Sequence, residues 1–135
     1  MLGRIYGKDL MEADYSQRFD LIVPVPLHPS RRKLRGYNQS EEFGKGLAQI
    51  LEVPCDGTHM VRAAKTETQT HKSKLSRWEN VNRIFEVINP ASITDKRVLL
   101  VDDVVTTGAT LEACGDALLR AGCGELSIAC IAATQ

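Results

Sequence analysis

The fold is decided by the stretch VLLVDDVVTTGAT, residues 98–110. It opens with an apolar run that is typical of a buried β-strand, and Asp102 and Asp103 follow at the carboxyl end of that run. The chain then turns through Gly108 into TLEACGDALLRAG (110–122), whose apolar residues recur at helical spacing. The stretch therefore predicts a strand that delivers two carboxylates to the start of a helix.

The turn after the two aspartates has the composition of a phosphate-binding loop. Its backbone N–H groups point outward at a helix N-terminus, and they are joined by the hydroxyls of Thr106, Thr107 and Thr110. Carboxylates repel phosphate but accept hydrogen bonds from vicinal hydroxyls, so a ribose 5-phosphate suits both halves. The alternative is an ordinary strand-to-helix turn with two exposed aspartates. A Walker A loop and a GxGxxG dinucleotide loop are excluded, because their glycine and lysine patterns do not occur here.

The rest of the chain alternates between strand and helix patterns. Apolar β-branched runs predict strands, and SEEFGKGLAQILE predicts a helix that Ser40 or Asn38 caps. A polar segment of about 20 residues without a clear period (63–83) interrupts the pattern, and it is either a misread element or a functional lid. The predicted strands are 19–26, a weaker one over 57–61, 84–88, 97–103 and 125–133, and the predicted helices are 40–52 and 110–122. This order predicts an α/β fold with an open, mainly parallel sheet flanked by helices.

Length and charge limit the classes of function. The 135 residues suit one domain, 1–135, with an N-terminal extension over 1–18. The formal net charge is zero, which disfavours a generic electrostatic nucleic-acid binder. The charge is nevertheless segregated: residues 28–83 hold eleven Lys and Arg against six Asp and Glu, and the remainder holds six against eleven. A basic middle suits a polyanionic small molecule, and a solvated basic surface is the alternative.

The apolar runs, the N-terminus and the cysteines indicate the cellular location of the protein. No apolar run approaches the roughly 18 residues of a membrane span, and MLGRIYGKDL has no signal-peptide core. We expect a cytoplasmic protein without membrane insertion. The four cysteines form no CxxC pair and have no histidine at a zinc spacing, so we expect them to be small buried apolar residues (Cys55, Cys114, Cys123 and Cys130).

Residues 98–110 resemble the phosphoribosyl pyrophosphate (PRPP) loop of type I phosphoribosyltransferases. Two further segments narrow the resemblance to the ComF family of competence-associated, phosphoribosyltransferase-like proteins: VPVPLHPSRRKLRGYNQS (23–40) and RAAKTETQTHKSKLSRWENV (62–81), with Phe85 after it. The resemblance covers nearly all of residues 19–133. It implies a type I phosphoribosyltransferase fold in which residues 63–82 form a mobile hood loop. The cysteine-rich, zinc-ribbon-like N-terminal segment usual in that family has no counterpart in this sequence.

The resemblance also implies a role for individual residues. Asp102 and Asp103 would be the catalytic pair that holds the ribose hydroxyls. The 5-phosphate would be bound by Thr106, Thr107, Gly108, Ala109 and Thr110. The diphosphate would be bound by Leu27, His28, Arg35 and Gly36, and the hood would contribute Lys65, Lys72, Lys74 and Arg77. Mg²⁺ would arrive with PRPP, with no metal site made by the protein alone and with Asp102 and Asp103 as the side chains that could contact it.

The activity implied by the resemblance is displacement of diphosphate from C1 of PRPP by an unidentified nitrogen acceptor. Salvage of hypoxanthine or guanine is not expected, because Thr106 stands where 6-oxopurine transferases have an aspartate. The alternative is a non-catalytic accessory protein of DNA uptake, with competence proteins or single-stranded DNA as partners. By analogy with the superfamily, a homodimer is a further expectation. A dead site is disfavoured, since the aspartates and the TTGAT loop are intact.

Overall fold

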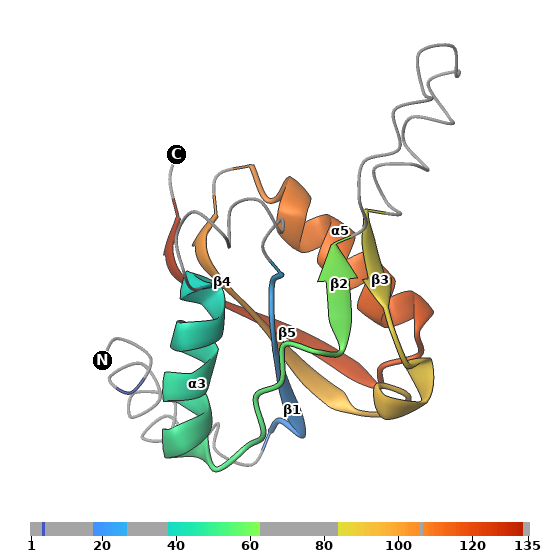
Figure 1. Cartoon of the computed structure of the whole chain (residues 1–135), viewed down its shortest axis with the longest axis horizontal. Helices are drawn as coiled ribbons and strands as arrows, with labels where there is room; N and C mark the ends of the chain where they lie inside the picture. Colours follow the sequence, from blue (N-terminus) through green and yellow to red (C-terminus); the bar gives the residue numbers. More distant parts are fainter. Residues whose placement is uncertain (1–3, 5–17, 27–37, 63–83, 106, 134–135) are drawn as a thin grey trace.

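The computed structural model describes residues 4, 18–26, 38–62, 84–105 and 107–133. Five strands, two α-helices and one short 3-10 helix lie within these ranges (Figure 1). In chain order they are β1 Leu21–Pro24, α3 Gln39–Leu51, β2 Met60–Arg62, β3 Phe85–Val87, the 3-10 helix Pro90–Ser92, β4 Arg97–Val105, α5 Ala109–Arg120 and β5 Glu125–Ala133. Each predicted strand and helix is found, within a few residues of its predicted limits.

The main sheet is parallel and has the order β1-β4-β5. β1 lies beside β4 with Leu21 opposite Val98, and β4 lies beside β5 with Arg97 opposite Glu125. The segment around Cys55 adds one parallel bridge to Ile22 on the other side of β1. Because every strand of this sheet points the same way, the carboxyl ends of β1, β4 and β5 meet at one edge, which we call the carboxyl edge. The predicted parallel sheet is confirmed.

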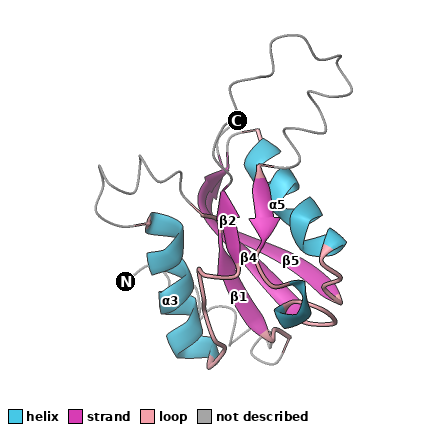
Figure 2. Cartoon of the chain, turned by 45° about the vertical axis from the view of Figure 1, so that its right-hand side comes forward, coloured by secondary structure: helices cyan, strands magenta, loops and turns pink. Residues whose placement is uncertain are grey.

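The two helices cover opposite faces of this sheet (Figure 2). Side chains alternate along β1 and β4: Leu21, Val23 and Leu100 pack with α5, whereas Ile22 and Leu99 pack with α3. Each face forms its own core, and Leu118 of α5 and Leu47 of α3 are both fully buried. Gly44 allows α3 to approach the sheet closely. A Cβ at this position would lie 2.8 Å from the Cys55 sulfur and 3.2 Å from a Val101 methyl carbon. Burial on both faces is what the continuous apolar run of β4 predicts.

Strands β2 and β3 form a separate antiparallel pair, with Met60 opposite Val87 and Arg62 opposite Phe85. Met60 and Phe85 are buried in the core on the α5 side. In the part of the chain that the structure describes, neither strand pairs with the parallel sheet. The pair therefore flanks the sheet on the α5 face, with the end of β2 and the start of β3 at the carboxyl edge (Figure 1).

The end of β4 differs from the prediction, and the start of α3 decides between the two predicted caps. β4 continues to Val105, two residues beyond the predicted limit, because Val104 and Val105 pair with Ala132 and Ala133 of β5. The two aspartates consequently lie inside the strand rather than at its end. At α3, Asn38 is the N-cap: its side-chain oxygen accepts a hydrogen bond from the Ser40 backbone N–H at 3.0 Å. None of the described helices is long and apolar enough to cross a membrane.

An ion pair joins β1 and β4 at the amino ends of the strands, which we call the amino edge. The Arg97 guanidinium, at the start of β4, donates to both carboxylate oxygens of Asp20, at 3.1 Å from Nε and 2.9 Å from Nη2. The Arg97 backbone N–H also donates to Asp20 at 2.8 Å. These bonds hold the pKa of Asp20 down at about 2, with the Arg97 side chain as the main cause. The pair fixes β1 and β4 in register at their amino ends.

Candidate functional site

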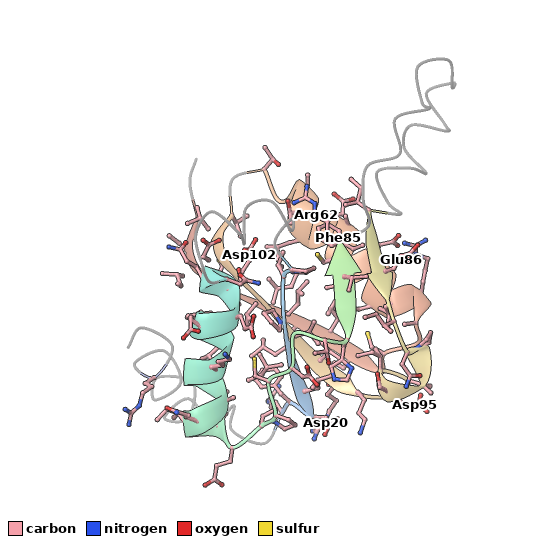
Figure 3. The ribbon with its side chains drawn as sticks, viewed as in Figure 1. Asp20, Arg62, Phe85, Glu86, Asp95 and Asp102 are labelled. Carbon is pink, nitrogen blue, oxygen red and sulfur yellow. The ribbon has the colours of Figure 1, made fainter. Side chains whose placement is uncertain are left out.

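The candidate site lies at the carboxyl edge, where β1, β4 and the N-termini of α3 and α5 come together. Figure 3 shows Asp102 at this edge and Asp20 at the opposite one. Helix N-termini carry partial positive charge from their unpaired N–H groups. Two such termini beside one carboxylate make the edge suitable for a ligand that has both hydroxyls and negative charge.

Asp102 is the central group of the site. Its side chain is 9% exposed. Oδ1 accepts hydrogen bonds from the Ser40 hydroxyl at 2.9 Å and from the Asp103 backbone N–H at 2.8 Å. Burial raises the pKa of Asp102 above its ordinary value, and these two hydrogen bonds oppose the rise. Among the described residues, no lysine or arginine forms an ion pair with Asp102.

Asp103 is more exposed than Asp102. Its carboxylate accepts a hydrogen bond from the Val104 backbone N–H at 2.8 Å. The two adjacent aspartates thus face different surroundings: Asp102 is anchored beneath α3, and Asp103 lies toward solvent. The carboxylates remain close in sequence and space, and the negative charge of Asp103 also raises the pKa of Asp102.

The turn after β4 gives α5 an N-terminus without a side-chain cap. Gly108 is the N-cap with φ 81° and ψ −2°, a left-handed conformation that favours glycine. The Ala109 N–H donates to the Thr107 hydroxyl at 3.3 Å, and the Glu112 N–H donates to the Gly108 carbonyl. The N–H groups of Thr110 and Leu111 lie in the first turn, where a helix supplies no backbone acceptor. A hollow of about 40 Å³ adjoins them, lined by Asp102 and by residues of the turn.

A contact that the sequence did not reveal connects α3 to Asp102. Sequence reasoning considered Asn38 and Ser40 only as alternative helix caps, but both have separate tasks in the structure. Asn38 caps the helix and also donates from Nδ2 to the Val25 carbonyl at 3.0 Å. Ser40, 3% exposed, is left to donate its hydroxyl to Asp102. The signal that could have found this is the spacing Asn-x-Ser, which frees the serine once the asparagine is the cap.

Arg62 is a second residue that sequence reasoning did not single out. It ends β2, and its guanidinium lies 5.6 Å from the centre of the Phe85 ring on the neighbouring strand. A cation–π contact of this kind restrains a long side chain at the surface. Burial raises the pKa of the Cys114 thiol, the charge of Asp102 adds to that rise, and the charge of Arg62 opposes it. Figure 3 shows Arg62 and Phe85 at the same edge as Asp102.

Several predicted site residues lie outside the described part of the chain. These are the diphosphate group, Leu27, His28, Arg35 and Gly36; the hood group, Lys65, Lys72, Lys74 and Arg77; and Thr106 of the phosphate loop. Their predicted roles stay predictions. Val25 and Asn38, which stand on either side of the diphosphate group in the sequence, lie together, because the Asn38 side chain donates a hydrogen bond to the Val25 carbonyl.

The donor set at this edge suits Mg²⁺ only in part. Mg²⁺ prefers oxygen ligands and retains water or substrate oxygens in its coordination shell. Within the described ranges, no group of three or more His, Cys, Asp and Glu is arranged to hold an ion. Asp102 and Asp103 are oxygen donors of the right kind, so they fit an ion that brings most of its ligands with its substrate.

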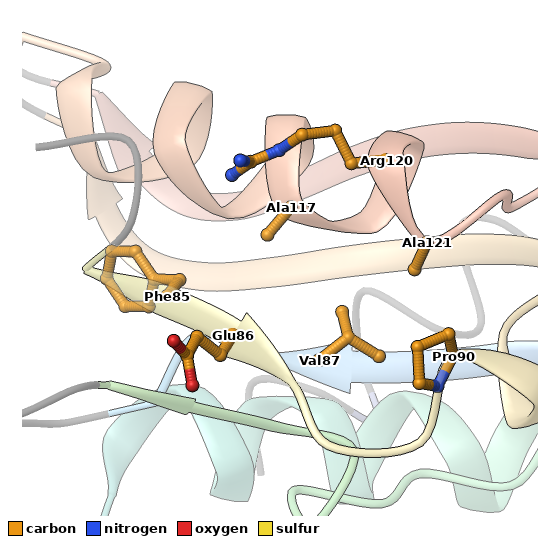
Figure 4. A pocket seen from close by; sticks show the side chains of 7 residues that line it. All are labelled: Phe85, Glu86, Val87, Pro90, Ala117, Arg120 and Ala121. Atoms are coloured by element: carbon orange, nitrogen blue, oxygen red, sulfur yellow. The ribbon is translucent and has the colours of Figure 1, made fainter. Parts of the chain in front are cut away.

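A larger hollow of about 450 Å³ lies between β3 and α5 (Figure 4). Its floor is apolar, with Val87, Ala117 and Ala121, and Glu86 and Arg120 stand at its rim. Both charged side chains are largely exposed, and no buried nucleophile or carboxylate of the described residues points into it. For these reasons the smaller hollow at Asp102 is the better candidate site, despite its size.

Asp56, His59 and Ser92 form a cluster with the composition of a hydrolase triad. His59 Nδ1 lies 2.9 Å from the Ser92 hydroxyl, and Nε2 lies 3.5 Å from Asp56. The Ser92 hydroxyl, however, donates a hydrogen bond to the Asn89 carbonyl at 2.7 Å, and Asp56 accepts a hydrogen bond from the Thr58 hydroxyl. The serine proton is therefore not directed at the histidine. The cluster fastens the start of β2 to the 3-10 helix.

Comparison with protein families decides the family of the chain. The model of the phosphoribosyl transferase domain matches residues 38–135, which include both aspartates, the turn and Ser40. The chain belongs to the phosphoribosyl transferase domain family. The fold class predicted from the sequence is thereby confirmed, and the carboxyl edge described above lies within the matched region.

Curated relatives narrow this further. The chain is 34% identical to Competence protein F of Haemophilus influenzae over 110 residues, or 81% of this chain and 48% of that protein. It is 36% identical to DNA utilization protein YhgH of Salmonella typhimurium over 136 aligned positions, 98% of this chain and 59% of the relative. Competence protein ComFC of Bacillus subtilis is 33% identical over 80% of this chain and 42% of its own length. These names confirm the predicted likeness to the ComF family, and the chain spans about half the length of these relatives.

Solved structures support the fold alone. Glutamine PRPP amidotransferase from B. subtilis, complexed with ADP and GMP, superposes with a TM-score of 0.66 at 20% identity. The alignment covers 96% of this chain and 26% of that one. Adenine phosphoribosyltransferase from Saccharomyces cerevisiae superposes with a TM-score of 0.60 at 20% identity, over 98% of this chain and 66% of that one.

Proposed function

We propose that the chain binds PRPP with Mg²⁺ at residues 102–110 and transfers the phosphoribosyl group to a nitrogen acceptor, with release of diphosphate. The observation that carries the proposal is the buried Asp102 carboxylate beside the glycine-capped N-terminus of α5. Asp102 accepts hydrogen bonds from ribose hydroxyls, and the N–H groups of Thr110 and Leu111 bind the 5-phosphate. A ribose phosphate carries both a diol and a phosphate, so it can fill both halves of this arrangement.

The reaction needs few groups from the protein. The C1–O bond to diphosphate breaks and its electron pair leaves with the diphosphate, while the acceptor nitrogen forms the C1–N bond and later loses its proton. Positive charge develops at C1, where the nearby carboxylates of Asp102 and Asp103 stabilise it. Asp102 and Asp103 would hold Mg²⁺ together with PRPP, and the ion would supply charge neutralisation for the leaving diphosphate. The protein holds the ribose still and fixes the phosphate, and positioning of this kind accounts for a large part of rate enhancement.

A titration calorimetry experiment tests the proposal. Wild-type protein is titrated with PRPP with and without Mg²⁺, and again as the double variant Asp102→Asn plus Asp103→Asn. We expect saturable, Mg²⁺-dependent binding in the wild type and its loss in the double variant. Asp116→Asn is the matched control, because Asp116 is a partly exposed aspartate on α5, outside the proposed site, where it pairs with Arg120. Absence of PRPP binding to the wild-type chain would falsify the proposal.

A second candidate function is an accessory role in DNA uptake or utilization, which the printed names of the relatives favour. This role shares PRPP binding with the first proposal and differs in turnover. Diphosphate release, measured across a panel of amines and nucleobases with the PRPP-bound protein, separates the two. Release that depends on Asp102 supports the transferase; tight binding without release from any acceptor supports the accessory role.

A further inference from the structure

Ser40 holds the one carboxylate that the site buries. Its hydroxyl is 2.9 Å from Asp102 Oδ1, and the two residues are 62 positions apart in the chain. Both side chains are buried, Ser40 at 3% and Asp102 at 9% exposure. Buried hydrogen bonds to a charged oxygen are stronger than those between neutral groups. Ser40 therefore fixes the direction in which the Asp102 carboxylate faces.

The hydrogen bonds that the described residues make to Asp102 both end on Oδ1. The Ser40 hydroxyl and the Asp103 N–H approach this oxygen from α3 and from the strand itself. The two bonds restrain rotation of the carboxylate, and Oδ2 accepts no hydrogen bond from the described residues. A hydroxyl of the ligand then meets a preorganised oxygen rather than one of several rotamers.

Asn38 makes this arrangement possible. Because its side-chain oxygen caps α3, Ser40 does not have to serve as the cap. Its Nδ2 group meanwhile binds the Val25 carbonyl at 3.0 Å, which ties the start of α3 to the end of β1. The segment 38–40 thus fixes both the helix and, through Ser40, the acceptor oxygen of the site.

We propose that Ser40 is a positioning residue that orients the Asp102 carboxylate toward a ribose hydroxyl of PRPP. The inference rests on the proposed function and deepens it. It assigns Ser40 no contact with the ligand: Ser40 acts through Asp102. It follows that loss of the hydroxyl weakens ligands that carry the ribose and leaves unchanged a ligand that carries phosphate alone.

The test compares two ligands in Ser40→Ala and in wild type. We expect the affinity for PRPP with Mg²⁺ to fall about tenfold, as for loss of one hydrogen bond to a charged group. Affinity for inorganic phosphate, followed by nuclear magnetic resonance, should not change. Ser92→Ala is the matched control, because it removes a serine hydroxyl from the 3-10 helix. It should leave both affinities at the wild-type value.

Each outcome decides the matter. Unchanged PRPP affinity in Ser40→Ala would overturn the inference and leave the proposed function standing. An equal loss for PRPP and phosphate would also overturn it, because a merely structural role predicts that result. If the wild-type chain binds no PRPP, both the proposed function and the inference fail. If Ser40→Ala does not fold, Ser40→Cys keeps the shape of the side chain, with a slightly larger atom and a weaker donor. Its PRPP affinity should still fall, and its affinity for phosphate should not change.

Discussion

Asp20 and Asp102 lie at opposite ends of the same pair of strands and have opposite surroundings. Asp20 receives the Arg97 guanidinium on both oxygens, and its pKa falls to about 2. Asp102 is bonded by a neutral hydroxyl and a backbone N–H, and burial raises its pKa. At the amino edge the charge is neutralised within the fold. At the carboxyl edge it is oriented but not neutralised, which is what a binding carboxylate requires and a structural one does not.

The largest expected effect separates the two aspartates by function. Asp102→Asn should lower PRPP affinity by about 100-fold, since it removes a buried charged acceptor, and should not lower the melting temperature at pH 7, because the buried charge is removed as well. Asp20→Asn should do the reverse: lower the melting temperature and leave PRPP affinity unchanged. Calorimetric titration and thermal unfolding of both variants measure this. The comparison breaks if either variant changes both quantities.

A medium effect is expected at two glycines, one at each edge. Gly108 and Gly122 have φ values of 81° and 91°. A Cβ at Gly108 would meet no atom within 4 Å, and one at Gly122 would meet Thr94 at an ordinary 3.7 Å. Substitution by alanine should therefore cost only backbone strain, about 1 kcal/mol of unfolding free energy in either variant.

The two glycine variants should nevertheless differ in binding. Gly108→Ala alters the turn that aims the N–H groups at the phosphate, so its PRPP affinity should fall, whereas Gly122→Ala should bind as the wild type does. Urea unfolding measures the stability and calorimetry the affinity. Equal binding by both variants would remove Gly108 from the proposed phosphate site.

The smallest effect is the pH dependence of stability in acid. Asp20 has a folded pKa of about 2, below its ordinary 3.8, so the unfolded chain binds more protons between these values. The stability that Asp20 contributes is present above about pH 4 and is lost as the pH falls toward 2. Asp102 contributes to stability in the opposite direction. Because its pKa is raised in the folded state, its ionisation lowers the free energy of unfolding as the pH rises above 3.8.

Thermal unfolding of wild type, Asp20→Asn and Asp102→Asn between pH 2 and pH 6 follows both contributions. We expect Asp20→Asn to flatten the decline of stability between pH 4 and pH 2. Asp102→Asn should instead gain stability relative to wild type as the pH rises. A wild-type curve that both variants reproduce would mean that neither carboxylate has a shifted pKa.

Much of the fold could be predicted from local patterns. The apolar run Val98–Val101 and the helical spacing of Leu111, Cys114 and Leu118 each specify burial by themselves, and the structure buries all of them. The end of β4 was missed because Val104 and Val105 precede a turn-rich stretch, and only the pairing with β5 keeps them extended. The assignment of β2 and β3 to a separate sheet could not be foreseen, since three-residue strands carry too little alternation to identify a partner.

The site was only half predictable for a related reason. Asp102 and the glycine turn are contiguous, and their chemistry is visible in the sequence. The Asn-x-Ser spacing indicates that the Ser40 hydroxyl is free to bond elsewhere, but no local pattern identifies Asp102 as its partner, because the hydrogen bond joins positions 62 residues apart. The position of Arg62 over Phe85 depends likewise on the pairing of β2 with β3.

The parallel order β1-β4-β5 has a consequence for the order of folding. The unit β4-α5-β5 is contiguous over 97–133, whereas β1 joins β4 through residues 77 positions apart, Asp20 and Arg97. Closing a long loop costs entropy before its contacts form, so local units gain structure first. We expect residues 97–133 to become structured early and the Ser40–Asp102 contact to form when β1 and α3 dock. The turn at Gly108 would then form before Ser40 restrains the Asp102 carboxylate. Hydrogen exchange during refolding should show protection of the two halves of the site in that order.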